Sequence, residues 1–180
     1  MRKIDMTGIE ETREFRRPSA GPYVCIITDV EDHPKEQYLE VEYDIADGEF
    51  NGYYADMRDR GFNWAGKYRK YYTEKSKPFF KRFCSAVSKS NGNFVFDAGE
   101  INCEEKTLIG KQIGLVFQEC EYDANDGTVK TRLEIFKEFP VDKIADQKIP
   151  ELKKKARTGP ADSSNSVFVA PGVDEELPFA

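Results

Sequence analysis

The sequence is poor in the residues and motifs on which catalysis usually depends. It has one histidine, His33, and four cysteines, Cys25, Cys84, Cys103 and Cys120, which are far apart and form no CxxC motif. This spacing does not suit a zinc site, so we expect the cysteines to be small buried residues in a reducing compartment. The sequence contains neither a P-loop nor a Ser/His/Asp arrangement. It therefore predicts no catalytic residues, no metal site and no cofactor.

Long apolar runs are also missing. No stretch approaches the ~18–20 apolar residues that span a bilayer, and the N-terminal Met-Arg-Lys-Ile-Asp lacks the apolar region of a signal peptide. We therefore expect a cytoplasmic protein with no membrane partner. An apolar share of 39% beside a charged share of 33% fits one modest domain with polar extensions. Thirteen Phe and nine Tyr argue against wholesale disorder.

Hydrophobic periodicity predicts a mainly β domain over residues 21–144. Runs of β-branched residues, or alternating apolar and polar side chains, indicate strands, and turn residues such as Asp47-Gly48 separate them. The first three strands are expected to follow one another as an antiparallel meander. The predicted strands span residues 23–30, 38–45, 49–57, 112–122 and 128–139.

One helix is predicted between the third and fourth strands. It begins at Lys77, with Pro78 in its first turn, and ends near Asn91. Three strands, a helix and two strands is the element order of the OB-fold, a five-stranded Greek-key barrel. A β-sandwich or an SH3-like barrel is the alternative. The apolar residues expected on the buried helix face are Phe79, Phe80, Phe83, Ala86 and Val87.

Polar segments flank the predicted domain. Residues 1–20 are expected to form a loose lead-in, and residues 145–172 have the Lys, Gly, Pro and Ser content of a flexible linker with a reach of about 30 Å. The acidic residues of segment 173–180 are followed by Leu-Pro-Phe. Exposed apolar side chains at the end of a mobile tail indicate a peptide that docks into a partner's pocket, steered by its acidic residues.

Charge is unevenly distributed along the chain. Segment 58–82 carries nine basic and two acidic residues, a net charge of +7, although the whole chain carries −6. Aromatic residues are interleaved with the cations. This pattern is typical of a groove for single-stranded nucleic acid, because cations neutralise phosphates and aromatic rings stack on unpaired bases. The candidate contacts are Arg58, Arg60, Phe62, Trp64, Lys67, Tyr68, Arg69, Lys70, Tyr71, Tyr72 and Lys75.

Other interpretations of these polar residues stay open. Trp64 could cap one end of a barrel, and the cations could be an ordinary solvated face. The carboxylates Glu40, Glu42 and Asp44 alternate along a predicted strand and could serve a metal-dependent nuclease. The same alternation is usual for the solvent-exposed face of a sheet. A protein-interaction adaptor with an OB-like barrel is a further alternative. His33 lies in a polar turn, where we expect it to be exposed.

The whole pattern resembles bacterial-type and phage-encoded single-stranded DNA-binding proteins. In that class an OB-fold core is followed by a flexible linker and an acidic tip that ends in Ile/Leu-Pro-Phe. The segments GPYVCIITDVE, EYDIADGEFNGYYADM and LIGKQIGLVFQECEYDANDGTVKTRLEI are similar to the strand pattern of a phage and prophage family found among replication and recombination genes. The resemblance implies sequence-tolerant coating of single-stranded DNA in the cytoplasm of a bacterial host.

The resemblance also implies a role for the tip. It would recruit replication or recombination proteins, with the Phe179 ring in an apolar pocket and the acids at a basic edge. Ala180 departs from the family, whose Phe is usually the last residue, so the terminal carboxylate lies one residue further on. A homo-oligomer and a preference for single-stranded RNA both stay open. The tip residues that match the family are Asp174, Glu175, Glu176, Leu177, Pro178 and Phe179.

Overall fold

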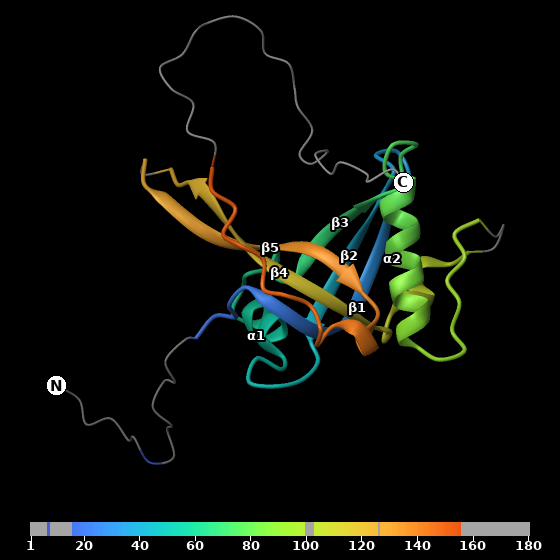
Figure 1. Cartoon of the computed structure of the whole chain (residues 1–180), viewed down its shortest axis with the longest axis horizontal. Helices are drawn as coiled ribbons and strands as arrows, with labels where there is room; N and C mark the ends of the chain where they lie inside the picture. The colour runs from blue at the N-terminus through green and yellow to red at the C-terminus, as the bar shows by residue number, and fades with distance from the viewer. Residues whose placement is uncertain (1–6, 8–15, 100–102, 126, 156–180) are drawn as a thin grey trace, which may run out of the picture.

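The fold is mainly β, as predicted. The computed structural model describes residues 7, 16–99, 103–125 and 127–155, and within them one five-stranded sheet is accompanied by two helices (Figure 1). Neither helix is long and apolar enough to cross a membrane. The elements are β1 (Gly21–His33), β2 (Tyr38–Ile45), α1 (Tyr53–Asp59), β3 (Lys67–Tyr71), α2 (Lys77–Ser90), β4 (Gln112–Asp123) and β5 (Val129–Phe139), with 3-10 turns at Glu105–Leu108 and Val141–Lys143.

The strands form an open antiparallel sheet in the order β3-β2-β1-β4-β5. Central β1 pairs with β4 through its first half and with β2 through its second, and a bulge between Ile27 and Asp29 falls in the pairing with β2. Because each neighbouring pair is antiparallel, the two edge strands β3 and β5 run parallel to each other. No ladder joins these two edges within the described residues.

Four predicted strands and the helix between strands three and four are confirmed, but the predicted strand at 49–57 is wrong. Residues 53–59 form α1 instead, because the buried Asp44 carboxylate accepts the backbone N–H groups of Tyr54 and Ala55, both at 2.9 Å. A carboxylate at the N-terminus satisfies free donors of the first turn and suits the helix dipole. The third strand is β3, inside the basic segment.

The core lies between the sheet and α2, which stands beside it in Figure 1. Phe80, Phe83, Ala86 and Val87 are buried as predicted, but Phe79 is 47% exposed. One residue of helix turns the side chain about 100°, so Phe79 leaves the face that its neighbour occupies. The cysteines are free thiols, with Cys25, Cys84 and Cys120 buried and Cys103 half-buried.

Both flanking segments touch the sheet at their inner ends. Pro18, from the predicted lead-in, is fully buried, and Arg17 Nη2 lies 3.4 Å from Glu119 Oε1. Lys153, from the predicted linker, exchanges two backbone hydrogen bonds of 2.9 Å with β4, at Glu119 and Glu121. The linker beyond residue 155 and the tip lie outside the described residues.

Candidate nucleic-acid interface

β3 runs through the middle of the basic segment and divides its side chains between two faces. Lys67, Arg69 and Tyr71 point to one face and are exposed. Tyr68 and Lys70 point to the other, where Tyr68 is half-buried and Lys70 buried. The predicted contact residues therefore do not share one surface. We call the first set, Lys67, Arg69 and Tyr71, the outer face of β3.

An aromatic row extends from the outer face across the neighbouring strands. The ring of Tyr71 lies 5.3 Å from that of Tyr38 on β2, which in turn stacks on His33 of β1 at 4.6 Å. The Arg69 guanidinium lies 4.8 Å over the Tyr38 ring, and a hydrogen bond with Tyr71 raises the pKa of Arg69. His33 is the last residue of β1 and is partly covered by this stacking, so its expected exposure in a turn is wrong.

Lys67 shares its charge with acidic residues of β2. Its Nζ lies 3.4 Å from Glu40 Oε1 and 3.6 Å from Glu42 Oε2, and Arg58 Nε lies 3.3 Å from Glu42 Oε1. Two carboxylates that could have served a nuclease are therefore ion-paired, and the third, Asp44, holds the N-terminus of α1. A phosphate that approaches Lys67 must compete with both glutamates.

The loop between α1 and β3 presents two aromatic rings to solvent. Trp64 is 71% exposed and Phe62 43% exposed, and their rings meet edge to face with centroids 6.0 Å apart. The exposure excludes a capping role for Trp64 in the core. Trp64 precedes Lys67 by three residues, so its Cα lies within ~11 Å of the start of the outer face. We call Phe62 and Trp64 the exposed ring pair.

The backbone beside the exposed ring pair is firmly held. Arg58, predicted to contact nucleic acid, instead donates from Nη1 to the Ala65 carbonyl oxygen at 3.0 Å. Gly66 follows with φ of 69°, and a Cβ there would collide with the Tyr43 carbonyl oxygen. The Tyr43 N–H of β2 donates to the Gly66 carbonyl oxygen at 2.7 Å. The loop is thus fixed to both α1 and β2, while its two rings remain exposed.

Lys70 belongs to a buried ion-paired cluster. Its Nζ lies 2.5 Å from Glu138 Oε1 on β5, and Arg82 Nη2 on α2 lies 3.5 Å from Glu138 Oε2. The cluster connects the two edge strands and the helix where the backbone makes no ladder. An unpaired buried charge is costly, so Lys70 must remain paired with Glu138. We therefore assign Lys70 to the stability of the fold and not to a phosphate contact.

The remaining predicted contacts are dispersed. The Tyr72 hydroxyl donates to Asp32 Oδ1 at 2.7 Å, and desolvation together with this bond raises the pKa of Tyr72 to about 12. Arg60 is exposed at the C-terminal end of α1, and Lys75 is exposed in the turn before α2. These three residues flank β3 in the chain without joining its outer face.

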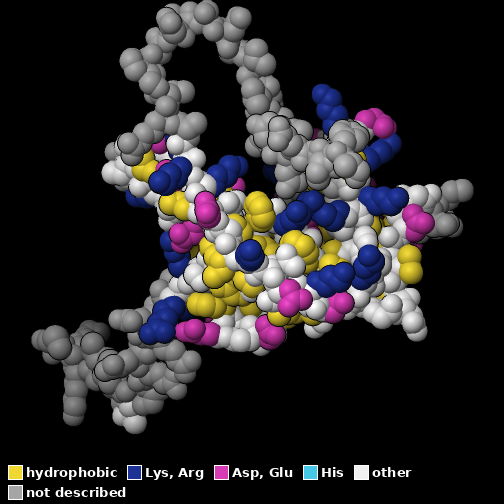
Figure 2. Space-filling view, viewed as in Figure 1, with side chains coloured by type: hydrophobic (Ala, Val, Ile, Leu, Met, Phe, Trp, Pro, Cys, Tyr) yellow, Lys and Arg dark blue, Asp and Glu magenta, His cyan; other side chains and the backbone are white. Residues whose placement is uncertain are grey.

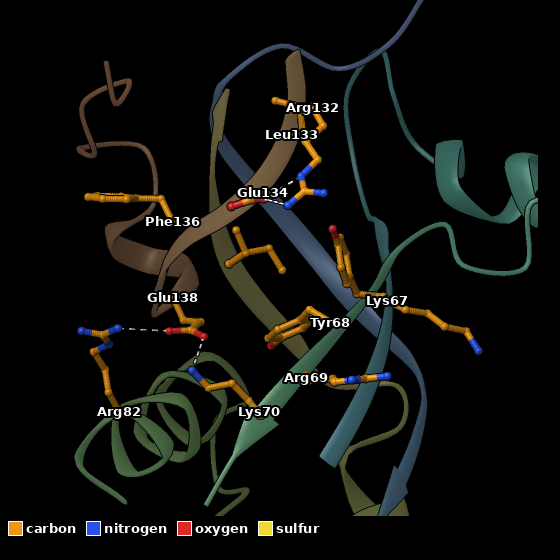
Figure 3. A pocket seen from close by; sticks show the side chains of 12 residues that line it. Lys67, Tyr68, Arg69, Lys70, Arg82, Arg132, Leu133, Glu134, Phe136 and Glu138 are labelled. Carbon is orange, nitrogen blue, oxygen red and sulfur yellow. Dashed lines mark hydrogen bonds and ion pairs between the residues drawn. The ribbon is translucent and has the colours of Figure 1, made fainter. Parts of the chain in front are cut away.

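A cavity of about 390 Å³ opens between the edge strands, and we call it the seam cavity (Figure 3). Tyr68 and Lys70 line it from β3, and Arg132, Glu134 and Ile135 line it from β5. The β5 residues could not be predicted from the sequence, because they lie more than sixty positions from β3 and in no basic run. Their only signal was the strand alternation around residues 131–136.

The folded protein therefore presents less positive charge to a ligand than segment 58–82 carries in the sequence, because several of its cations are paired with carboxylates. On the face shown in Figure 2, Lys and Arg side chains are interspersed with Asp and Glu around a group of hydrophobic side chains. Attraction for a polyanion must come from the cations that point outward, above all Arg69. The chain matches no protein-family model and has no significant match among the curated proteins.

Proposed function

We propose that this protein binds single-stranded DNA without catalysis and with little sequence preference. The observation that carries the proposal is the exposed ring pair, Phe62 and Trp64, held on a fixed loop that leads directly into β3 and its outer face. Two large rings exposed together on one loop form an apolar patch, and such a patch indicates a binding site more strongly than a single exposed ring does. Unpaired bases offer the π faces that such rings stack on, whereas duplex DNA hides them.

The fold that we propose is an OB-type barrel left open between β3 and β5. A helix lies between β3 and β4, and β1 pairs with both β2 and β4. The Lys70–Glu138 ion pair bridges the two parallel edges at one point. In OB-folds the β2–β3 face is a usual site for oligonucleotides, and here that face carries the aromatic row and Arg69.

We place this activity in phage replication or recombination, in the cytoplasm of a bacterial host. The support is the resemblance in strand pattern and in the acidic tip, Asp174 to Phe179. Replication or recombination proteins would be the partners that the tip recruits. The nuclease alternative is weaker, because its carboxylates are engaged by Arg58, Lys67 and α1.

The test is a titration with oligo(dT), followed by the intrinsic fluorescence of Trp64, the single tryptophan of the chain. We expect quenching on binding and a steep loss of affinity with added salt. In anisotropy measurements with labelled oligo(dT), Trp64→Ala should weaken binding about 5- to 150-fold, the equivalent of ~1–3 kcal/mol for one stacked base.

Phe79→Ala is the matched control, because it removes another exposed ring, on α2. It should bind oligo(dT) as the wild type does. Unchanged fluorescence of Trp64 at saturating oligo(dT) would contradict the proposal and point to a protein-interaction adaptor. Cleavage of the oligonucleotide that depends on added divalent metal would favour the nuclease.

A further inference from the structure

We propose that the seam cavity receives one unpaired base of the bound strand, while neighbouring phosphates stay at Lys67 and Arg69 on the outer face of β3, the strand that forms one wall of the cavity. This inference rests on the proposed single-stranded DNA binding and adds a second kind of contact to it. The exposed ring pair and the outer face would bind the DNA strand, and the seam cavity would bind one of its bases. It lies between two strands that are not paired with each other, so a flat group can enter without breaking a ladder.

The charges inside the cavity favour a neutral group over a phosphate. Lys70 and Arg82 both lie against Glu138, and Arg132 meets Glu134 Oε1 with Nε at 2.7 Å and Nη2 at 2.5 Å. Figure 3 shows Glu138 between Lys70 and Arg82, and Glu134 beside Arg132. A phosphate placed there would have to displace a carboxylate from its partner. A nucleobase carries no charge and could enter without displacing a carboxylate from its cation.

The outer face of β3, behind the cavity wall, has the opposite character. Lys67 and Arg69 flank Tyr68 in the strand, and Figure 3 shows both side chains extending away from β5. They would meet the sugar–phosphate backbone of a strand that lies on the outer face and turns one base past the edge of β3. Cations on the outer face and charge-balanced groups in the cavity together match a nucleotide unit, which has an anionic phosphate and a neutral base.

Tyr68 provides an unmet hydrogen bond at the base position. Its hydroxyl is buried and has no hydrogen-bond partner among the residues that the structure describes. Desolvation raises the pKa of Tyr68 well above its usual value, so the group remains a neutral phenol. A buried hydroxyl without a partner is unfavourable, and the polar edge of a base would satisfy it.

The walls and the volume also suit a base. The half-buried side chains of Leu133 and Ile135 and the ring of Tyr43 add apolar surface around Tyr68. The volume of about 390 Å³ falls within the ~300–1,000 Å³ of small-molecule sites. Because a hydrogen-bonding pocket discriminates between bases, binding should show a preference of at least about fivefold among oligonucleotides, superimposed on otherwise tolerant binding.

The first experiment compares ligands that separate base from phosphate. Full-length protein with labelled Ile and Leu methyl groups is titrated with dAMP, dCMP, dGMP, dTMP and inorganic phosphate, and Ile135→Val assigns the methyl signal. We expect at least one nucleotide to move the Ile135 methyl resonance upfield by its ring current, and inorganic phosphate to leave it in place. Equal shifts with inorganic phosphate would overturn the inference in favour of an anion site.

The second experiment uses Tyr68→Phe, which keeps the ring and removes only the hydroxyl. We expect the preference among dA, dC and dT oligomers to fall at least fivefold, with an unchanged salt slope and an unchanged melting temperature. An unaltered preference, or none in the wild type while oligo(dT) still binds, overturns the base pocket and leaves the proposed function standing. Absence of binding to every oligonucleotide overturns both.

Discussion

The cations of one basic segment divide into an inward set and an outward set. Lys70 and Arg82 turn inward to Glu138 and connect β3, α2 and β5. Arg69 turns outward on the same strand as Lys70 and lies over an aromatic ring at the surface. In the function that we propose, adjacent positions of one strand would thus serve stability and binding separately. A charge count along a sequence overstates the charge that a ligand meets, because part of it is already neutralised inside the fold.

The strongest test of the inward set is Glu138→Ala. The substitution leaves Lys70 buried without a carboxylate, which should cost about 3–5 kcal/mol of unfolding free energy and lower the Tm by roughly 10–20 °C. Thermal unfolding followed by circular dichroism measures it. The double variant Lys70→Met/Glu138→Leu should recover most of the loss, since it removes both charges. A Tm for Glu138→Ala within 2 °C of the wild type would show that the ion-paired cluster does not stabilise the contact between β3 and β5.

The second largest effect is expected at Asp44, which holds the N-terminus of α1, the helix that precedes the loop of the exposed ring pair. Asp44→Ala leaves the N–H groups of Tyr54 and Ala55 without their acceptor and should cost about 1–3 kcal/mol in urea unfolding. Asp44→Asn retains one acceptor oxygen and should lose less. Equal stabilities of both variants and wild type would mean that α1 forms without this carboxylate.

Asp44 and Lys70 also explain why α1 and β3 could not be predicted from the sequence. The long strands and α2 have local periodicity, so their patterns sufficed. Residues 53–59 include adjacent tyrosines that favour a strand, and they become a helix because a carboxylate from β2 meets them. β3 has a lysine among its inward residues, which hides its alternation, and that lysine is acceptable only because β5 supplies Glu138. Both errors come from partners distant in sequence.

Part of the candidate site could also be predicted from the sequence, and part could not. Interleaving of cations and aromatics identified the exposed ring pair, because Phe62 and Trp64 have no helical or strand pattern that would bury them. It could not separate Arg69 from Arg58, whose partners Glu42 and Ala65 lie on other elements. The β5 wall of the seam cavity was invisible, since only the sheet order places it opposite β3.

The outward set is tested by Arg69→Ala. Removing one phosphate contact should reduce the slope of log K against log salt by about 1, and weaken oligo(dT) binding most at low salt. Stability should stay at the wild-type value because the guanidinium is exposed. Lys106→Ala is the control, an exposed cation paired with Asp29 outside the outer face. If both variants lose the same slope, binding reflects general surface charge and not the outer face.

The smallest expected effect separates Lys67 from Arg69 within the outward set. Lys67 Nζ is ion-paired with Glu40 and Glu42, so part of its charge is already neutralised in the free protein. Glu40→Gln should free that charge and tighten oligo(dT) binding about twofold at low salt, with a slightly steeper salt slope. Glu42 is unsuitable for this test, because it also holds Arg58. Weaker binding by Glu40→Gln, with unchanged stability, would mean that Glu40 positions Lys67 for the phosphate and does not compete with it.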